Sequence, residues 1–234
     1  MSISVVLPTY NEAENILPMI QALRLALGGR LTEIIVVDDD SPDRTWEMAE
    51  SAAEPVCRVL RRIGRRGLAS ALSEGIAASR GDIVVWMDCD LGMSAAEVPR
   101  LVDALDHCDV AIGSRYAAGG SDLRAPLRAR MSRMLNRFAS LVLDGRIRDY
   151  TSGFAAAKRN VFETAPLPAI GYGDYFIEWA YRCLRRGFCV REVGYIFKER
   201  ARGLSKTAPD TMTFLLLGFR YFNRVIRSRL CYAA

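Results

Sequence analysis

Residues 81–91 read GDIVVWMDCDL, an apolar run that ends in two aspartates, Asp88 and Asp90, with one residue between them. Such continuous apolar runs are typical of strands buried on both faces of a parallel sheet. In an open α/β sheet, ligands bind at the carboxyl ends of the strands. Two carboxylates placed there can hold Mg²⁺ or Mn²⁺ against a diphosphate. The stretch therefore predicts either a metal-assisted phosphate site, as in a transferase with a nucleotide-activated donor, or an ordinary polar turn.

The first half of the chain alternates between apolar runs and segments with helical spacing. The apolar runs predict strands over residues 2–7, 33–37, 56–60, 83–87 and 109–113. The helical spacing predicts helices over residues 14–27, 45–53, 67–78 and 95–105. This alternation predicts an α/β fold, in which a doubly wound, mostly parallel central sheet is flanked by helices.

After Arg115 the pattern changes to amphipathic helices rich in arginine. Helices are predicted over residues 126–143, 174–186 and 211–230, and short strands over 151–157 and 189–197. We expect one domain over residues 1–210. The basic helix within residues 211–234 is expected to belong to that domain or to contact a membrane.

Charge is distributed unevenly between the two halves. Residues 1–114 carry 10 basic and 18 acidic side chains, whereas residues 115–234 carry 22 basic and 9 acidic ones. The basic half is expected to face something anionic, such as phosphates or a membrane surface, unless it is simply a solvated surface. No nucleic-acid-binding module is recognisable, so that a nucleic acid is not an expected partner.

Cysteine and histidine usage narrows the chemistry. The six cysteines form no C-x-x-C pair, which favours reduced thiols in a cytoplasmic setting over disulfides or a zinc site. The single histidine, His107, lies far from the predicted strand ends, which argues against histidine-based catalysis. No signal peptide and no membrane span is predicted.

Polar clusters follow three of the predicted strands, at residues 8–12, 38–41 and 88–90. Because they share the carboxyl ends of the strands, we expect them to form one site. Tyr10 could stack on a base, and Asp39 could accept hydrogen bonds from a nucleoside. Ser41 or Asp43 is expected to cap the following helix.

Seven stretches between residue 3 and about residue 206 carry a family resemblance: VVLPTYNEAENI, IIVVDDDSPDRT, RRGLASALSEGI, GDIVVWMDCDL, IGSRY, DYTSGFAAAKR and KERARGLSK. The chain resembles family 2 glycosyltransferases of the Rossmann-like GT-A fold. Within them it is most similar to the dolichyl-phosphate mannose synthase group, which are polyprenyl-phosphate sugar synthases. The last three stretches are the more specific to that group.

The resemblance implies a set of site residues. The nucleotide sugar would be bound by Pro8, Tyr10, Glu12, Val37, Asp39, Asp88, Cys89, Asp90, Arg115, Arg200 and Lys206. Of these, Asp90, Arg115 and Arg200 would be catalytic, and Asp88 and Asp90 would bind Mg²⁺ or Mn²⁺. Asp149 and Glu178 would orient sugar hydroxyls or basic residues, or form structural ion pairs.

One position departs from the family pattern. Family members often have a polar residue, frequently glutamine, two positions after the second aspartate, where this chain has Gly92. Metal coordination would then depend on Asp88, Asp90, the diphosphate and water. A weaker or unusual metal preference follows as a hypothesis.

The implied activity is the transfer of a hexose to dolichyl or undecaprenyl phosphate, with inversion at the anomeric carbon. The favoured donor is GDP-mannose, which supplies mannose. The product would be a β-linked polyprenyl-phosphate sugar. A lipid phosphate is already an anion, so that it needs cations and alignment rather than a strong base. The alternatives are UDP-glucose or another donor, a non-lipid acceptor, a nucleotidyltransferase, or an inactive binding subunit.

A water-insoluble acceptor implies contact with a membrane. The helices around residues 131–143 and 211–230 could lie in the interface, with Met131, Met134, Leu135, Phe138 and Leu141 in the acyl boundary and arginines on headgroups. We therefore expect a peripheral protein on the cytosolic face of a membrane. The other reading is that both helices pack against the sheet or against a membrane-anchoring partner.

Overall fold

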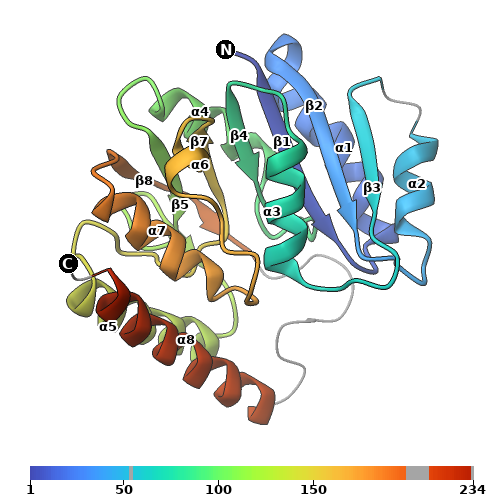
Figure 1. Ribbon diagram of the computed structural model, residues 1–234. Coiled ribbons are helices and arrows are strands. Elements are labelled where there is room, and N and C mark those ends of the chain that lie inside the picture. Colours follow the sequence, from blue (N-terminus) through green and yellow to red (C-terminus); the bar gives the residue numbers. More distant parts are fainter. Residues whose placement is uncertain (53–54, 199–210, 233–234) are drawn as a thin grey trace.

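Seven segments pair side by side into one sheet, in the order β3-β2-β1-β4-β7-β5-β8 (Figure 1). The computed structural model describes residues 1–52, 55–198 and 211–232. The strands of the sheet are β1 (Ile3–Thr9), β2 (Leu31–Asp38), β3 (Cys57–Arg61), β4 (Ile83–Trp86), β5 (Val110–Ser114), β7 (Ala155–Lys158) and β8 (Val190–Gly194). Only β7 runs antiparallel to its neighbours in this sheet, so that the expected mostly parallel sheet is confirmed.

Helices cover both faces of the sheet because successive strand residues point to opposite sides. The face that presents Val5, Val36 and Val85 packs against α1 (Ala13–Leu27), α2 (Thr45–Ser51) and α4 (Val98–Ala104). The face that presents Val6, Val84 and Trp86 packs against α3 (Leu68–Ala78), α5 (Pro126–Val142), α6 (Val161–Thr164) and α7 (Tyr175–Arg185). The near-continuous apolar strands are explained by this burial on both sides.

Trp86, the last residue of β4, lies in the centre of the second face. It is fully buried, and its ring meets that of Trp179 edge to face, with 4.9 Å between the centroids. Large buried aromatic rings contribute strongly to core stability. This packing fixes the end of β4, from which Asp88 and Asp90 project.

Some element boundaries differ from the sequence expectation. β7 begins at Ala155 instead of residue 151, because Gly153 takes a positive φ of 71° and turns the chain before the strand. The strand expected over residues 189–197 is divided into β8 and β9 (Ile196–Phe197), and β9 pairs with β6 (Ser121–Asp122) in a separate sheet. Two short 3-10 helices, η1 (Gly28–Arg30) and η2 (Ala95–Glu97), precede β2 and α4.

The last helix, α8 (Thr211–Cys231), forms an outer layer on α5 and α7 (Figure 1). Phe222 of α8 stacks on Phe138 of α5 with 4.8 Å between the ring centroids. Phe138 therefore faces α8. None of the helices in the described ranges combines the length and the apolar character that crossing a bilayer requires.

Candidate active site

Asp88, Cys89 and Asp90 follow β4 directly, at the carboxyl end of the central strands. The Gly92 backbone N–H donates to Asp90 Oδ1 at 3.0 Å, and Leu91 adopts a left-handed φ of 61° to allow this turn. The Gly92 carbonyl in turn accepts from the Lys198 N–H at 3.1 Å. The loop is thereby tied to the segment that follows β9. Cys89 packs in the core, so that a ligand contact here would come from its backbone.

The two carboxylates are the kind of hard oxygen ligands that Mg²⁺ and Mn²⁺ take. Within the described residues, no group of three or more His, Cys, Asp or Glu side chains is placed to hold a metal ion. An ion held by Asp88 and Asp90 would take its other ligands from phosphate oxygens and water. A Cβ at Gly92 would lie 3.0 Å from Asp90 Oδ1 and 3.0 Å from the Lys198 carbonyl oxygen. This crowding is consistent with glycine, and not glutamine, at this position.

The ends of β1 and β2 are joined by buried hydrogen bonds. Asp38 accepts from the hydroxyls of Thr9 and Ser41, each at 2.7 Å, and the Asn11 N–H donates to Ser41 Oγ at 3.0 Å. Asp43 accepts from the Thr45 N–H at the start of α2, at 3.0 Å. The helix-start role that the sequence offered to Ser41 or Asp43 therefore falls to Asp43.

Asp39 is buried and held by two groups. Arg62 Nε donates to Asp39 Oδ1 at 2.7 Å, and the Gly67 N–H donates to Asp39 Oδ2 at 2.7 Å. Arg62 is itself only 2% exposed. Sequence reasoning passed over Arg62, although the unusual run Arg61-Arg62-x-x-Arg65-Arg66 between β3 and α3 was a visible signal.

The remaining residues expected in a nucleoside pocket differ in how deeply they are buried. Tyr10 is half-buried next to Pro8, and the Arg66 guanidinium lies over its ring at 3.7 Å from the centroid. Glu12 is buried and accepts from Asn15 Nδ2 at 2.7 Å. The Val37 side chain is fully buried in the core under α3, so that a contact with a ligand would come from its backbone.

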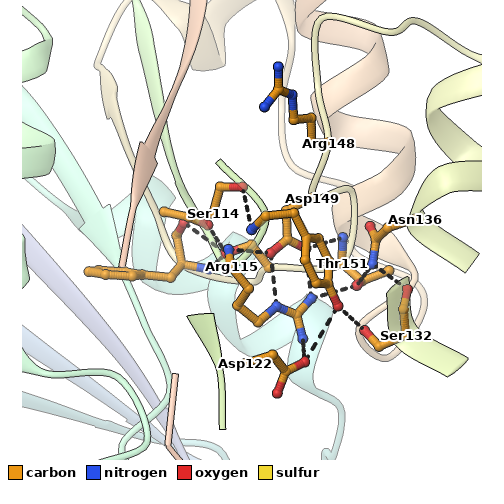
Figure 2. Close-up of polar contacts among 12 residues, drawn as sticks. Ser114, Arg115, Asp122, Ser132, Asn136, Arg148, Asp149 and Thr151 are labelled. Carbon is orange, nitrogen blue, oxygen red and sulfur yellow. Dashed lines mark hydrogen bonds and ion pairs between the residues drawn. The ribbon is translucent and has the colours of Figure 1, made fainter. Parts of the chain in front are cut away.

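Arg115 lies in a second polar cluster, at the end of β5 (Figure 2). Its Nε and Nη2 donate to the two oxygens of Asp149 at 2.8 and 2.6 Å, and Nη2 also donates to Thr151 Oγ1 at 2.8 Å. Asp122 Oδ2 lies 3.8 Å from Nη1. Burial alone would lower the pKa of Arg115, but the Asp149 carboxylate raises it above its ordinary value. Arg115 is therefore a buried, permanently charged group.

Neighbouring residues extend this cluster toward α5. Asn136 Nδ2 donates to Thr151 Oγ1 at 2.8 Å (Figure 2). The Tyr116 hydroxyl donates to Ser132 Oγ at 2.9 Å. Sequence reasoning missed Ser132 and Asn136, because their contacts join segments that are distant in the chain. The available signal was that Ser132 and Asn136 form a polar face on α5, a helix that is otherwise apolar and basic.

Three tyrosines have raised pKa values. Burial raises the pKa of Tyr175, Tyr195 and Tyr221 above the usual value, and the Asp88 carboxylate adds to each shift. Tyr175 and Tyr195 are buried in the core, whereas Tyr221 of α8 is partly buried against it.

Glu178 belongs to a separate ion network on α7. It accepts from Arg182 and from Arg224 at 2.6 Å each, and Arg224 Nε also donates to Asp174 at 2.9 Å. The sequence left open whether Asp149 and Glu178 orient sugar hydroxyls or basic residues, or form structural ion pairs. In the structure, both residues contact basic side chains. Arg200 and Lys206 lie outside the described residues.

Comparison with known proteins gives a consistent picture. The family model described as Glycosyl transferase family 2 matches residues 4–165. The chain is 38% identical over 97% of its length to the dolichol-phosphate mannosyltransferase of Pyrococcus furiosus, but it spans only 63% of that relative. It is 38% identical over 89% of its length to the polyprenol monophosphomannose synthase of Mycolicibacterium smegmatis, covering 82% of that protein. The undecaprenyl-phosphate mannosyltransferase of Micrococcus luteus is 33% identical over 88% of the chain and is covered to 87%.

Solved structures match the fold. Glucosyl-3-phosphoglycerate synthase from Mycobacterium tuberculosis, in complex with Mn²⁺, UDP and its product, has a TM-score of 0.74 at 22% identity, covering 97% of this chain and 79% of that one. The same enzyme with Mg²⁺ and UDP has a TM-score of 0.73 at 22% identity and the same coverage. At this identity the match establishes a GT-A-like fold. Because the family model covers more than half of the chain and three relatives at 33–38% identity span 88–97% of it, the chain belongs to glycosyl transferase family 2.

Proposed function

We propose that this chain moves a mannosyl group from GDP-mannose to the phosphate of a polyprenol, with inversion at the anomeric carbon. The observation that carries the proposal is its likeness, at 33–38% identity over most of its length, to relatives named as mannosyltransferases and a mannose synthase of polyprenyl phosphates. The aspartate pair after β4 supports it, because such a pair suits a diphosphate leaving group.

The chemistry needs no general base. An oxygen of the acceptor phosphate, already an anion, forms a bond to the anomeric carbon while the bond to the nucleoside diphosphate breaks. One displacement converts an α-linked donor into a β-linked product. The protein's tasks are to align the two substrates and to neutralise charge.

Asp88 and Asp90 would hold Mg²⁺ or Mn²⁺ next to the donor diphosphate. When bound, such an ion stabilises the negative charge of the departing diphosphate. The Gly92 N–H donates to Asp90 Oδ1 and thereby orients this carboxylate. Crystals of the M. tuberculosis synthase hold Mn²⁺ or Mg²⁺ together with UDP, which supports the same arrangement.

Cations for the phosphates come from the second half of the chain. Arg115 uses Nε and Nη2 on Asp149 and Thr151, so that a phosphate contact would be made by Nη1. Nη1 also lies 3.8 Å from Asp122 Oδ2, so that a phosphate would share this nitrogen with a carboxylate. Arg200 and Lys206 remain predictions from the sequence for the same task.

The acceptor would be reached at a membrane surface. On α5 the side chains of Leu127, Met134 and Leu141 are exposed, and on α8 those of Phe219 and Leu230. Exposed arginines accompany them on both helices, namely Arg133, Arg137, Arg220, Arg227 and Arg229. A surface that combines apolar and basic side chains suits the headgroup region of an anionic bilayer.

Transfer of radiolabelled sugar tests the proposal directly. The wild-type protein, with Mg²⁺ or Mn²⁺, should transfer mannose from GDP-mannose to polyprenyl phosphate, and more efficiently than glucose from UDP-glucose. Asp90→Ala should reduce transfer by about a hundredfold or more, because the ion loses its principal protein ligand. Asp106→Asn, an exposed aspartate next to α4, is the control and should be fully active. Undiminished transfer by Asp90→Ala would contradict the mechanism, and transfer to a non-lipid acceptor alone would contradict the function.

A further inference from the structure

An exposed arginine lies over the aromatic ring at the end of β1. The Arg66 guanidinium carbon is 3.7 Å from the centroid of the Tyr10 ring. Within the described part of the chain, Arg66 forms no ion pair with a carboxylate, in contrast to its neighbours Arg62 and Arg65. A guanidinium stacked flat on a ring keeps its N–H groups pointing outward in its own plane. Among the described residues, Arg66 therefore presents a donor fork without a carboxylate partner at the edge of the expected base pocket.

Asp39 is bound by the residue that follows Arg66 in the chain. The Gly67 N–H donates to Asp39 Oδ2 at 2.7 Å. Gly67 has a φ of +153°, which glycine tolerates best. Consecutive residues thus contact the Asp39 carboxylate and the Tyr10 ring.

Asp39 keeps some acceptor capacity for a ligand. A carboxylate has about four acceptor positions. Arg62 Nε donates to Asp39 Oδ1 at 2.7 Å, and the Gly67 N–H donates to Oδ2 at 2.7 Å. The remaining acceptor positions suit N1–H of guanine and N3–H of uracil alike. Asp39 alone therefore does not distinguish the two bases.

Arg66 supplies the distinction. Next to its N1–H, guanine has O6 and then N7, two acceptors on one edge that match an arginine fork bidentately. Uracil has only O4 there, adenine pairs N7 with an amino donor, and cytosine has an amino donor. We propose that Arg66, stacked on Tyr10, selects guanine as the base of the nucleotide-sugar donor by pairing with O6 and N7. The inference deepens the proposed function and rests on it.

Binding of nucleoside diphosphates, measured by calorimetry without any acceptor, tests the proposal. The wild-type protein should bind GDP about 5- to 100-fold more tightly than UDP, the range of one bidentate pair. It should bind 7-deaza-GDP, which lacks the N7 acceptor, about tenfold more weakly than GDP. Arg66→Met keeps an unbranched stem over Tyr10 without donors. This variant should bind GDP and 7-deaza-GDP equally and lose most of the preference over UDP.

A neighbouring arginine that is also exposed provides the matched control for this binding experiment. Arg65→Met removes the neighbouring exposed arginine, which pairs with Glu74, and should leave the GDP to UDP ratio unchanged. Equal weakening of GDP, 7-deaza-GDP and UDP by Arg66→Met would mean that Arg66 only packs on Tyr10, and would overturn the proposal. So would tighter binding of UDP by the wild type. Failure of the proposed function is seen separately, as an absence of mannose transfer by a wild type that still prefers GDP.

Discussion

Asp90 is oriented by the backbone of the residue two positions later. The Gly92 N–H donates to Asp90 Oδ1, while the Gly92 carbonyl accepts from Lys198. Both contacts depend on close approach, since a Cβ at Gly92 would lie 3.0 Å from Asp90 Oδ1. The absence of a side chain at this position therefore allows the contact that orients Asp90, a proposed metal ligand.

A methyl group at this position is expected to disturb the metal site. Gly92→Ala should raise the Mn²⁺ or Mg²⁺ concentration for half-maximal transfer about tenfold, because Asp90 must shift by a few tenths of an ångström. Gly92→Gln should behave likewise and not gain affinity. Gly145→Ala is the control, since a Cβ there meets no atom within 4 Å. Metal titration curves that coincide for the wild type and Gly92→Ala would contradict this view.

The buried ion pair of Arg115 and Asp149 is expected to contribute to the free energy of unfolding. Asp149→Asn leaves a buried guanidinium without its charge partner and should lower the free energy of unfolding by about 3 kcal/mol. Asp144→Asn is the matched control, because Asp144 pairs with Arg146, whose side chain is 65% exposed. It should cost about 1 kcal/mol or less. Urea unfolding measures both, and equal losses would show that burial of the Arg115 pair has no energetic weight.

At the scale of elements, α8 is joined to the rest of the molecule by charge as well as by rings. Arg224 donates to both Asp174 and Glu178, which lie at the start of α7. The two expected roles of this helix, part of the domain or membrane contact, are compatible, because its inner face packs on α5 and α7 and its outer face is exposed.

Loss of Arg224 should loosen this attachment. Arg224→Leu leaves Asp174, which is 3% exposed, without its strongest partner, and should lower the free energy of unfolding by about 3 kcal/mol. Arg227→Leu changes an exposed arginine three residues away and should change stability by less than about 0.5 kcal/mol. Thermal unfolding of the two variants compares them. A smaller loss for Arg224→Leu than for Arg227→Leu would refute the attachment through charge.

Some of the strands could be predicted from the sequence, whereas their arrangement and the long-range contacts could not. Strands β1, β2, β4 and β5 were predictable because each is a run of branched apolar residues followed by a polar cluster. The antiparallel insertion of β7 was not, since Ala155, Ala156 and Ala157 carry no strand preference of their own. The contacts of Arg115 with Asp149 and of Arg62 with Asp39 join segments 34 and 23 residues apart, a pairing that no local pattern specifies.

At the scale of the whole molecule, the acidic and basic halves of the sequence form different parts of the structure. The acidic first half forms β1 to β5 and helices α1 to α4, and the basic second half supplies α5, α7 and α8. α5 and α8 lie together at one side of the molecule (Figure 1). The molecule is therefore electrostatically polarised, with its apolar-and-basic surface on one side of the sheet and α1 on the other.

Vesicle binding should follow this polarity. The wild-type protein should float with vesicles containing phosphatidylserine at low salt and dissociate at high salt. Leu141→Asp, on α5, should weaken binding about tenfold. Leu25→Asp, on α1 at the opposite face, should have no effect, although the two leucines are similarly exposed at 86% and 80%. Equal effects of the two changes, or no binding of the wild type at low salt, would favour a partner protein over direct membrane contact.

The place of β7 in the sheet also constrains the order in which the chain can fold during synthesis. β5 leaves the ribosome before β7 and β8, yet these two are its only neighbours in the sheet. Until they appear, β5 has no strand to pair with and one edge of β4 stays open. Unpaired edges attract other strands and favour aggregation. A nascent chain of this protein therefore passes through a stage in which protection by chaperones would matter more than the stability of the finished fold suggests.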